Sequence, residues 1–166
     1  MKHTDDWYMK KALCAAQWAA RLDEVPVGCV IVKNDRIIAW GWNTRQTAQD
    51  PAGHAEMMAI RKASQKLGSW RLEDCTLYVT LEPCCMCAGA ILQSRIPRVV
   101  FGARDPKGGC CGSCLSVFDT KGFNHHPSAE GGCMEQDCGL ILTEYFREKR
   151  IRKKERKKKQ TGSLPE

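Results

Sequence analysis

The order of the elements that the sequence predicts indicates an α/β fold, with helices layered on a β-sheet. Segments with strand composition alternate with amphipathic segments of helical period, in the order helix, strand, strand, helix, strand, helix, strand. The length of 166 residues suits one domain, which can bury a core without disulfide staples.

The first half of the chain predicts a helix, a hairpin and a second helix. Residues 5–22 have an amphipathic pattern, and Asp5 or Asp6 can cap that helix. Its aromatic residues Trp7 and Trp18 are interpreted as core or interface residues and not as platforms for stacking bases. The hairpin turn is Lys33-Asn34-Asp35-Arg36, a sequence rich in turn formers. The two strands and the second helix are expected at residues 27–32, 37–42 and 54–67.

The second half predicts a strand, a short helix, a strand and a final helix. The expected ranges are 75–80, Pro83 to about Ser94, 99–102, and a helix from about Gln136. Pro127 and the glycines at 131 and 132 predict that any edge strand between the last two elements is poor or absent. The buried positions expected in the final helix are Leu140, Ile141, Leu142, Tyr145 and Phe146.

The net charge of +7 is concentrated at one end of the chain. Residues 147–160 hold ten Lys or Arg against Glu148 and Glu155, and the rest of the chain is close to neutral. Such a basic end fits a polyanionic partner, but charge alone equally fits a solvated tail. Residues 151–166 are expected to form a disordered basic tail.

Composition also bears on the compartment. There is no run of about 18 apolar residues and no signal segment, which predicts a cytoplasmic protein without a membrane partner. The eleven cysteines are an odd number in a chain that is not small, which favours free thiols in a reducing cytosol. A second metal site from Cys111, Cys114, Cys133 and Cys138 is a weaker alternative, because the last two are loosely spaced.

Two short motifs carry metal-binding residue types. His54-Ala55-Glu56 is followed thirty positions later by Cys84-Cys85-Met86-Cys87, preceded by Pro83. Cys84 and Cys87 fall on one side of a first helical turn, whereas Cys85 faces elsewhere and is the poorer ligand. One imidazole and two thiolates leave the fourth position of a tetrahedral zinc open, which is typical of catalytic sites. The pair of motifs is the H-x-E…P-C-x-x-C signature of zinc base deaminases, in which the glutamate, here Glu56, transfers protons.

Longer blocks extend the match beyond the metal motifs. These blocks are Val25-Pro26-Val27-Gly28, Gly41-Trp42-Asn43, residues 76–84, Cys87-Ala88-Gly89-Ala90 and residues 100–105. In this order they closely resemble the bacterial tRNA adenosine deaminase family of the cytidine deaminase-like superfamily. The resemblance covers nearly all of residues 1–150, which it implies are one zinc-dependent deaminase domain. It also implies a three-layer α/β/α fold with a mixed sheet of about five strands, and one zinc ion per subunit.

The resemblance further implies the substrate and the assembly. The implied reaction is deamination of adenosine to inosine at the wobble position of a tRNA anticodon stem-loop, with tRNA of the Arg-ACG type as the expected partner. The implied substrate-binding residues are Asn43, Ala55, Pro83, Asp105, Lys107 and Asn124. A homodimer is expected, and the apolar helix face 88–92 fits such a contact. The sequence departs from the family pattern at Cys110 and Cys111, where small residues are usual.

Two other classes of function remain open on the sequence. A small-molecule deaminase of the same superfamily, acting on cytidine, a deoxynucleotide or guanine, would not need the basic end. A non-catalytic zinc-binding RNA adaptor would have no use for Glu56, because a structural zinc site needs no unliganded carboxylate beside the metal.

Overall fold

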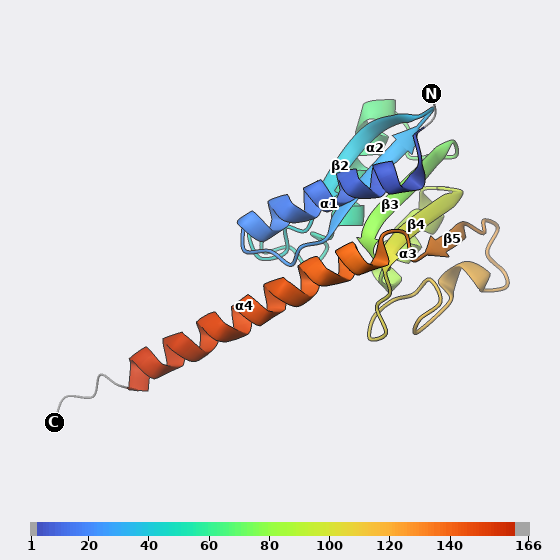
Figure 1. Ribbon diagram of the computed structural model, residues 1–166. Coiled ribbons are helices and arrows are strands. Elements are labelled where there is room, and N and C mark those ends of the chain that lie inside the picture. The colour runs from blue at the N-terminus through green and yellow to red at the C-terminus, as the bar shows by residue number, and fades with distance from the viewer. Residues whose placement is uncertain (1–2, 162–166) are drawn as a thin grey trace.

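A computed structural model describes residues 3–161 of the chain. Five strands form one sheet in the order β2-β1-β3-β4-β5, with α1 and α4 on one face and α2 and α3 on the other (Figure 1). The predicted three-layer α/β/α architecture is confirmed. The elements are α1 (Asp5–Arg21), β1 (Gly28–Lys33), β2 (Arg36–Trp42), α2 (Ala55–Leu67), β3 (Cys75–Leu81), α3 (Cys85–Gln93), β4 (Arg98–Ala103), a 3-10 turn (Val117–Asp119), β5 (Ser128–Gly131) and α4 (Glu135–Thr161).

The sheet is mixed. β1 pairs antiparallel with both β2 and β3, whereas β3, β4 and β5 run parallel to one another. The β1–β2 hairpin turns through Asn34 and Asp35, whose φ angles of 49° and 61° lie in the left-handed region that such tight hairpins require. Because β3 and β4 are parallel, the segments that leave them, from Glu82 and from Arg104, emerge at the same edge of the sheet.

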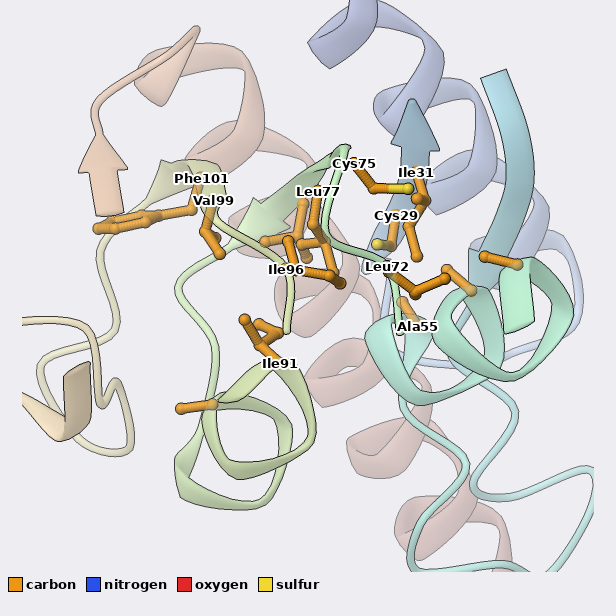
Figure 2. Packing of buried hydrophobic residues seen from close by; sticks show 14 of the residues in the cluster. Cys29, Ile31, Ala55, Leu72, Cys75, Leu77, Ile91, Ile96, Val99 and Phe101 are labelled. Carbon is orange, nitrogen blue, oxygen red and sulfur yellow. The ribbon is translucent and has the colours of Figure 1, made fainter. Parts of the chain in front are cut away.

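The sheet has a core on each face, because successive strand residues point to opposite sides. On the side of α2 and α3, Ile31, Leu77, Val99 and other strand residues pack against Leu72, Ile91 and Ile96 (Figure 2). On the other side the buried residues are Tyr8, Met9, Ala12, Val30, Val32, Tyr78, Val100, Ala103 and Cys138.

The first helix has a different cap from the one predicted, and one of its tryptophans is excluded from the core, which leaves the predicted interface role. Thr4 is the N-cap and accepts a hydrogen bond from the Trp7 N–H, whereas the Asp5 carboxylate binds Arg98, with 2.8 Å between Nη2 and Oδ2. Trp18 is 57% exposed, so it is not a core residue. The helix buries Tyr8, Met9 and its alanines against the sheet instead.

An edge strand forms where proline and glycine predicted a poor one. β5 pairs in parallel with β4 over four residues, and all four are exposed. Arg98 of β4 fastens it through an ion pair with Glu130, with Nε and Oε1 2.8 Å apart. A Cβ atom at Gly131 would lie 2.4 Å from Cζ of Phe101, so this glycine makes room for the ring beneath the strand.

The last helix extends further than expected and packs through other residues. It continues to Thr161, so the expected disorder from residue 151 is wrong for residues 151–161, and residues 162–166 lie outside the described part. Lys, Arg, Glu and Gln, which dominate this stretch, are good helix formers. Cys138 and Tyr145 are its buried residues, whereas Leu140 and Phe146 are exposed, contrary to the prediction.

The far half of α4 projects away from the domain (Figure 1). The Tyr145 hydroxyl donates to the carbonyl oxygen of Asp23 at 2.8 Å, and the Arg152 guanidinium lies 3.4 Å from the Asp23 carboxylate. Side chains 151–159 are all exposed.

Within residues 3–161, no helix combines the length and the apolar character that crossing a bilayer requires.

Glycines let two helices lie directly on the strands beneath them. A Cβ atom at Gly41 of β2 would lie 2.0 Å from the carbonyl oxygen of Ala55 in the first turn of α2. A Cβ atom at Gly28 of β1 would likewise lie 2.0 Å from the carbonyl oxygen of Ala12 in α1. Backbone atoms cannot move aside as a flexible side chain can, so any larger residue must displace the helix.

We therefore predict that Gly41→Ala lowers the free energy of unfolding by roughly 1–3 kcal/mol, as overpacking of a close contact does. Urea denaturation with a two-state fit measures it. Gly139→Ala is the matched control, because its Cβ atom would meet nothing within 4 Å in α4. That change should leave stability unchanged or raise it by up to about 1 kcal/mol. Equal losses in both variants would contradict the close-contact explanation.

Candidate active site

The starts of α2 and α3 meet on the same side of the sheet and supply the metal-binding residue types. His54 is the N-cap of α2, and Cys84 is the N-cap of α3. The His54 side chain makes no capping hydrogen bond to α2, and the Cys84 thiol is in contact with Cys87 in the first turn of α3. The peptide dipoles at two helix starts favour negative charge there, which suits thiolates.

The distances in this cluster fit a tetrahedral zinc. Nδ1 of His54 lies 3.6 Å from Sγ of Cys84 and 3.6 Å from Sγ of Cys87. Bonds of about 2.05 Å to nitrogen and about 2.3 Å to sulfur at a tetrahedral angle separate the two atoms by about 3.6 Å. The structure thus brings the predicted residues together at the spacing that zinc requires.

No second group of this kind occurs within residues 3–161. None of Cys111, Cys114, Cys133 and Cys138 belongs to a group of three or more metal-binding side chains, so the alternative of a second zinc site has no support in this part of the chain. Cys85 is exposed and lies outside the group, as its helical position predicted.

Contacts among the three side chains shift the pKa values of all three. The hydrogen bond from Cys87 lowers the pKa of the Cys84 thiol to about 3, and the same contact raises the pKa of Cys87. The contact with Cys84 also raises the pKa of the His54 imidazole. A thiolate in contact with a thiol and an imidazole is the nitrogen and sulfur donor set that zinc prefers.

Glu56 stands beside these residues in the first turn of α2 and is 4% exposed. Burial raises the pKa of its carboxyl group to about 7. A carboxyl group with a pKa near neutrality can both take up and release a proton, which is the requirement for a general base that later acts as an acid.

A cavity of about 160 Å³ opens beside the cluster. This is smaller than the roughly 300–1,000 Å³ of sites for drug-sized ligands, so it suits a fragment such as a single base. Its lining residues are Val25, Val27, Asn43, Arg45, His54, Ala55, Glu56, Leu81, Glu82, Cys84 and Asp105. A base that enters the cavity therefore lies directly against the cluster and Glu56.

Three of the predicted substrate-binding residues line this cavity, namely Asn43, Ala55 and Asp105. The Asn43 side chain is 6% exposed, and its Nδ2 donates to the carbonyl oxygen of Val25 at 3.3 Å. Its position at the end of β2 places it opposite the metal-binding turn.

The other three predicted residues do not line it. Pro83 is buried, and its carbonyl oxygen accepts the Cys110 N–H at 2.8 Å. Lys107 and Asn124 are exposed and lie outside the cavity. Conversely, sequence reasoning missed Arg45 and Glu82, because Arg45 lies in a polar loop without a motif and Glu82 precedes the metal-binding motif without belonging to it.

Comparison with known proteins gives the family. Residues 2–103 match the model described as the cytidine and deoxycytidylate deaminase zinc-binding region. A tRNA-specific adenosine deaminase of Bacillus subtilis (strain 168) is 49% identical over 154 residues, covering 93% of this chain and 96% of the relative. The protein of that name in Haemophilus influenzae is 45% identical over 151 residues, covering 90% and 87%.

Solved structures agree with the sequence relatives. A structure from a study of A-to-I editing by tRNA:A34 deaminases is 43% identical, has a TM-score of 0.79, and covers 81% of this chain and 98% of its own. A guanine deaminase from Bacillus subtilis is 42% identical with a TM-score of 0.58, but covers only 63% and 66%. The zinc-binding geometry and near full-length relatives with up to 49% identity together show that this chain belongs to the tRNA-specific adenosine deaminases, within the zinc-binding cytidine and deoxycytidylate deaminase family.

Proposed function

We propose that this protein hydrolytically deaminates adenosine to inosine at the wobble position of a tRNA anticodon. The observation that carries the proposal is the buried Glu56 beside a His54, Cys84 and Cys87 cluster at the end of a base-sized cavity. A structural zinc site would need neither the cavity nor the carboxylate. The relatives' names supply the substrate, since they are tRNA-specific adenosine deaminases.

His54, Cys84 and Cys87 would hold the zinc ion, one per chain. When bound there, zinc supplies the Lewis acidity that lowers the pKa of a water molecule toward about 7. Cys84 and Cys87 come from the start of one helix and His54 from the start of the other, so the protein holds the three ligands without flexible loops.

Glu56 is the proton carrier in this proposal. Its carboxylate accepts one proton from the attacking water and delivers it to N1 of adenine. It then takes the second water proton from the new C6 hydroxyl group and passes it to the leaving nitrogen. Water adds at C6, ammonia leaves, and inosine results. The burial of Glu56 beside His54 and the cysteines limits the contact of the carboxyl group with bulk water.

The cavity residues orient the base. We propose that Asn43 and the backbone at Ala55 contact the target nucleotide, and that Asp105 forms part of the wall next to it. Lys107 and Asn124 are exposed outside the cavity, where they suit contacts with the flanking RNA backbone. Pro83 directly precedes Cys84, and its carbonyl oxygen, which accepts the Cys110 N–H, remains the proposed contact of this residue with the substrate.

The partner in this proposal is a tRNA of the Arg-ACG type, located with the enzyme in the cytoplasm. Unpaired loop bases need little energy to leave a stack and enter a pocket. The exposed cations of α4 beyond Arg152 add sequence-independent contacts to phosphates.

We also propose a homodimer, through part of the helix face expected from the sequence. Of residues 88–92, Ala88, Ile91 and Leu92 are buried within their own chain and cannot contribute to the contact. Met86, Gly89 and Ala90 lie on the outer side of the same helix and are partly exposed, which makes that side the better surface.

The zinc ligands can be tested by metal analysis. We expect one zinc per chain in the natural protein and loss of the metal in Cys84→Ser, because the site then lacks one thiolate. Cys85→Ser is the control: this exposed neighbour lies outside the cluster and should leave the zinc content unchanged. Two zinc ions per chain, or loss only in the Cys85 variant, would assign different ligands.

The reaction itself is tested with an Arg-ACG tRNA transcript, scored for inosine at the wobble position. The natural chain should convert it, and Glu56→Ala should lose at least about 10²-fold in turnover, as expected without proton transfer. The variant should retain zinc and bind tRNA, because Glu56 is no ligand in this assignment.

Free cytidine, deoxycytidylate and guanine serve as the competing substrates in the same assay. Guanine matters most, because a guanine deaminase is among the similar structures. If a small molecule is turned over and no inosine forms in tRNA, that small molecule replaces tRNA as the proposed substrate. If the Glu56→Ala variant has near-normal turnover, Glu56 is excluded as the proton carrier.

The role of α4 is tested by deleting residues 153–166, which removes six Lys or Arg and two Glu. Affinity for tRNA should fall, and the slope of log affinity against log salt should flatten by about 0.7–0.9 for each phosphate that the protein no longer neutralises. Turnover at saturating tRNA should remain, since the deletion keeps the Arg152 ion pair with Asp23 and the whole cavity. Deletion of residues 162–166 removes no Lys or Arg and is the control. Equal binding by both truncations at every salt concentration would show that the basic end does not contact RNA.

A further inference from the structure

The cavity contains a second buried carboxylate, which the proposed reaction does not use. Glu82 follows β3 directly, is 2% exposed and lines the cavity two residues before Cys84. Buried carboxylates in proteins need hydrogen-bond donors around them, and the donors identify what such a group does.

All the donors to Glu82 come from one loop, residues 105–113. The N–H groups of Cys111 and Ser113 each donate to Oε1 at 3.0 Å. The Asp105 N–H donates to Oε2 at 3.0 Å, and the Ser113 hydroxyl donates to the same oxygen. Each oxygen therefore accepts two hydrogen bonds, and the carboxylate holds both ends of the loop.

The middle of the loop is fastened to the turn that follows Glu82. The Cys110 N–H donates to the Pro83 carbonyl at 2.8 Å, and Gly109 forms a bridge with Cys84. Gly109 lies so close that a Cβ atom there would be 2.4 Å from Cδ of Glu82. The loop thus rests on the carboxylate and on the metal-binding turn without a gap for a larger residue.

This arrangement joins two parts of the site that are distant in the sequence. Residues 82–84 lead into the metal-binding turn, and residue 105, at the start of the loop, forms part of the cavity wall. Most residues of the loop are exposed or only partly buried. Besides its bonds to Glu82, the loop is held by local hydrogen bonds, such as the one from the Gly109 N–H to the Asp105 carbonyl, and by the Val117 N–H, which donates to the Cys110 carbonyl.

We propose that Glu82 is a positioning residue: it fixes the loop 105–113 against the metal-binding turn and so holds Asp105 in the wall of the base cavity. This inference depends on the proposed function in one respect only, namely that tRNA is the substrate that binds against this wall. Glu82 acts through the loop backbone and takes no part in proton transfer, because the four donors occupy its oxygens. RNA binding should therefore depend on it more strongly than the chemical step does.

The test is Glu82→Gln, which keeps the shape but turns one acceptor oxygen into a donor that faces N–H groups. Amide hydrogen exchange should quicken by roughly tenfold or more at Asp105, Cys111 and Ser113, the scale of one missing buried hydrogen bond to a charged group. The KM for tRNA should rise by a similar factor, with a smaller change in kcat and with zinc content unchanged.

Three further variants separate positioning from general damage. Gly109→Ala pushes the loop off the carboxylate while leaving Glu82 in place, so it should reproduce the same exchange pattern and the same rise in KM. Ser113→Ala removes one of the four hydrogen bonds and should have a smaller effect. Glu73→Gln makes the same charge change on an exposed residue outside the cavity and should have none.

The inference is overturned if Glu82→Gln keeps the three amides protected, or exposes them with an unchanged KM. If that variant loses zinc or fails to fold, Gly109→Ala decides by the same two measurements. A natural chain that forms no inosine in tRNA refutes the proposed function, whereas an active natural chain with a normal Glu82 variant refutes this inference alone.

Discussion

The contact between the starts of α2 and α3 is the constraint on which the site depends. Each helix contributes its N-cap residue, and neither His54 nor Cys84 is one of the residue types preferred for capping. Gly41 lets α2 lie on β2 at backbone contact distance, which fixes His54 and Glu56 relative to the sheet. The α3 start is fixed in turn by β3, so the metal-binding atoms meet at 3.6 Å without any flexible connection.

Two buried glutamates in one cavity differ because their neighbours differ. Burial raises the pKa of Glu56 to about 7. Burial also acts to raise the pKa of Glu82, but the hydrogen bonds from the loop outweigh it and lower that pKa below its usual value. The first group can exchange a proton near neutral pH, whereas the second stays ionised and holds backbone. Chemistry and positioning are thus divided between two side chains of the same type.

The sequence by itself determined the fold class, the order of elements and the metal-binding set. Local patterns carry that information: strand composition and helical period give the elements, and the Cys84–Cys87 spacing places two thiols on one side of a turn. The helix at residues 151–161 escapes prediction, although its propensities allow it, because dense charge of one sign is also typical of disordered ends. The edge strand β5 is underestimated because its support comes from Arg98 and Phe101, which are distant in the sequence.

Only the tertiary structure decided which residues surround the base. Asn43, Arg45, Glu82 and Asp105 come from three separate loops, and no local pattern states that strand pairing brings those loops to one edge of the sheet. The same limit applies to burial. Trp18 is apolar on a helix with a buried face, yet it is exposed, because the face turned to the sheet is set by packing and not by the hydrophobicity of one residue. Residue types and spacings therefore determine which chemistry is available, and the packing of distant segments determines where it acts.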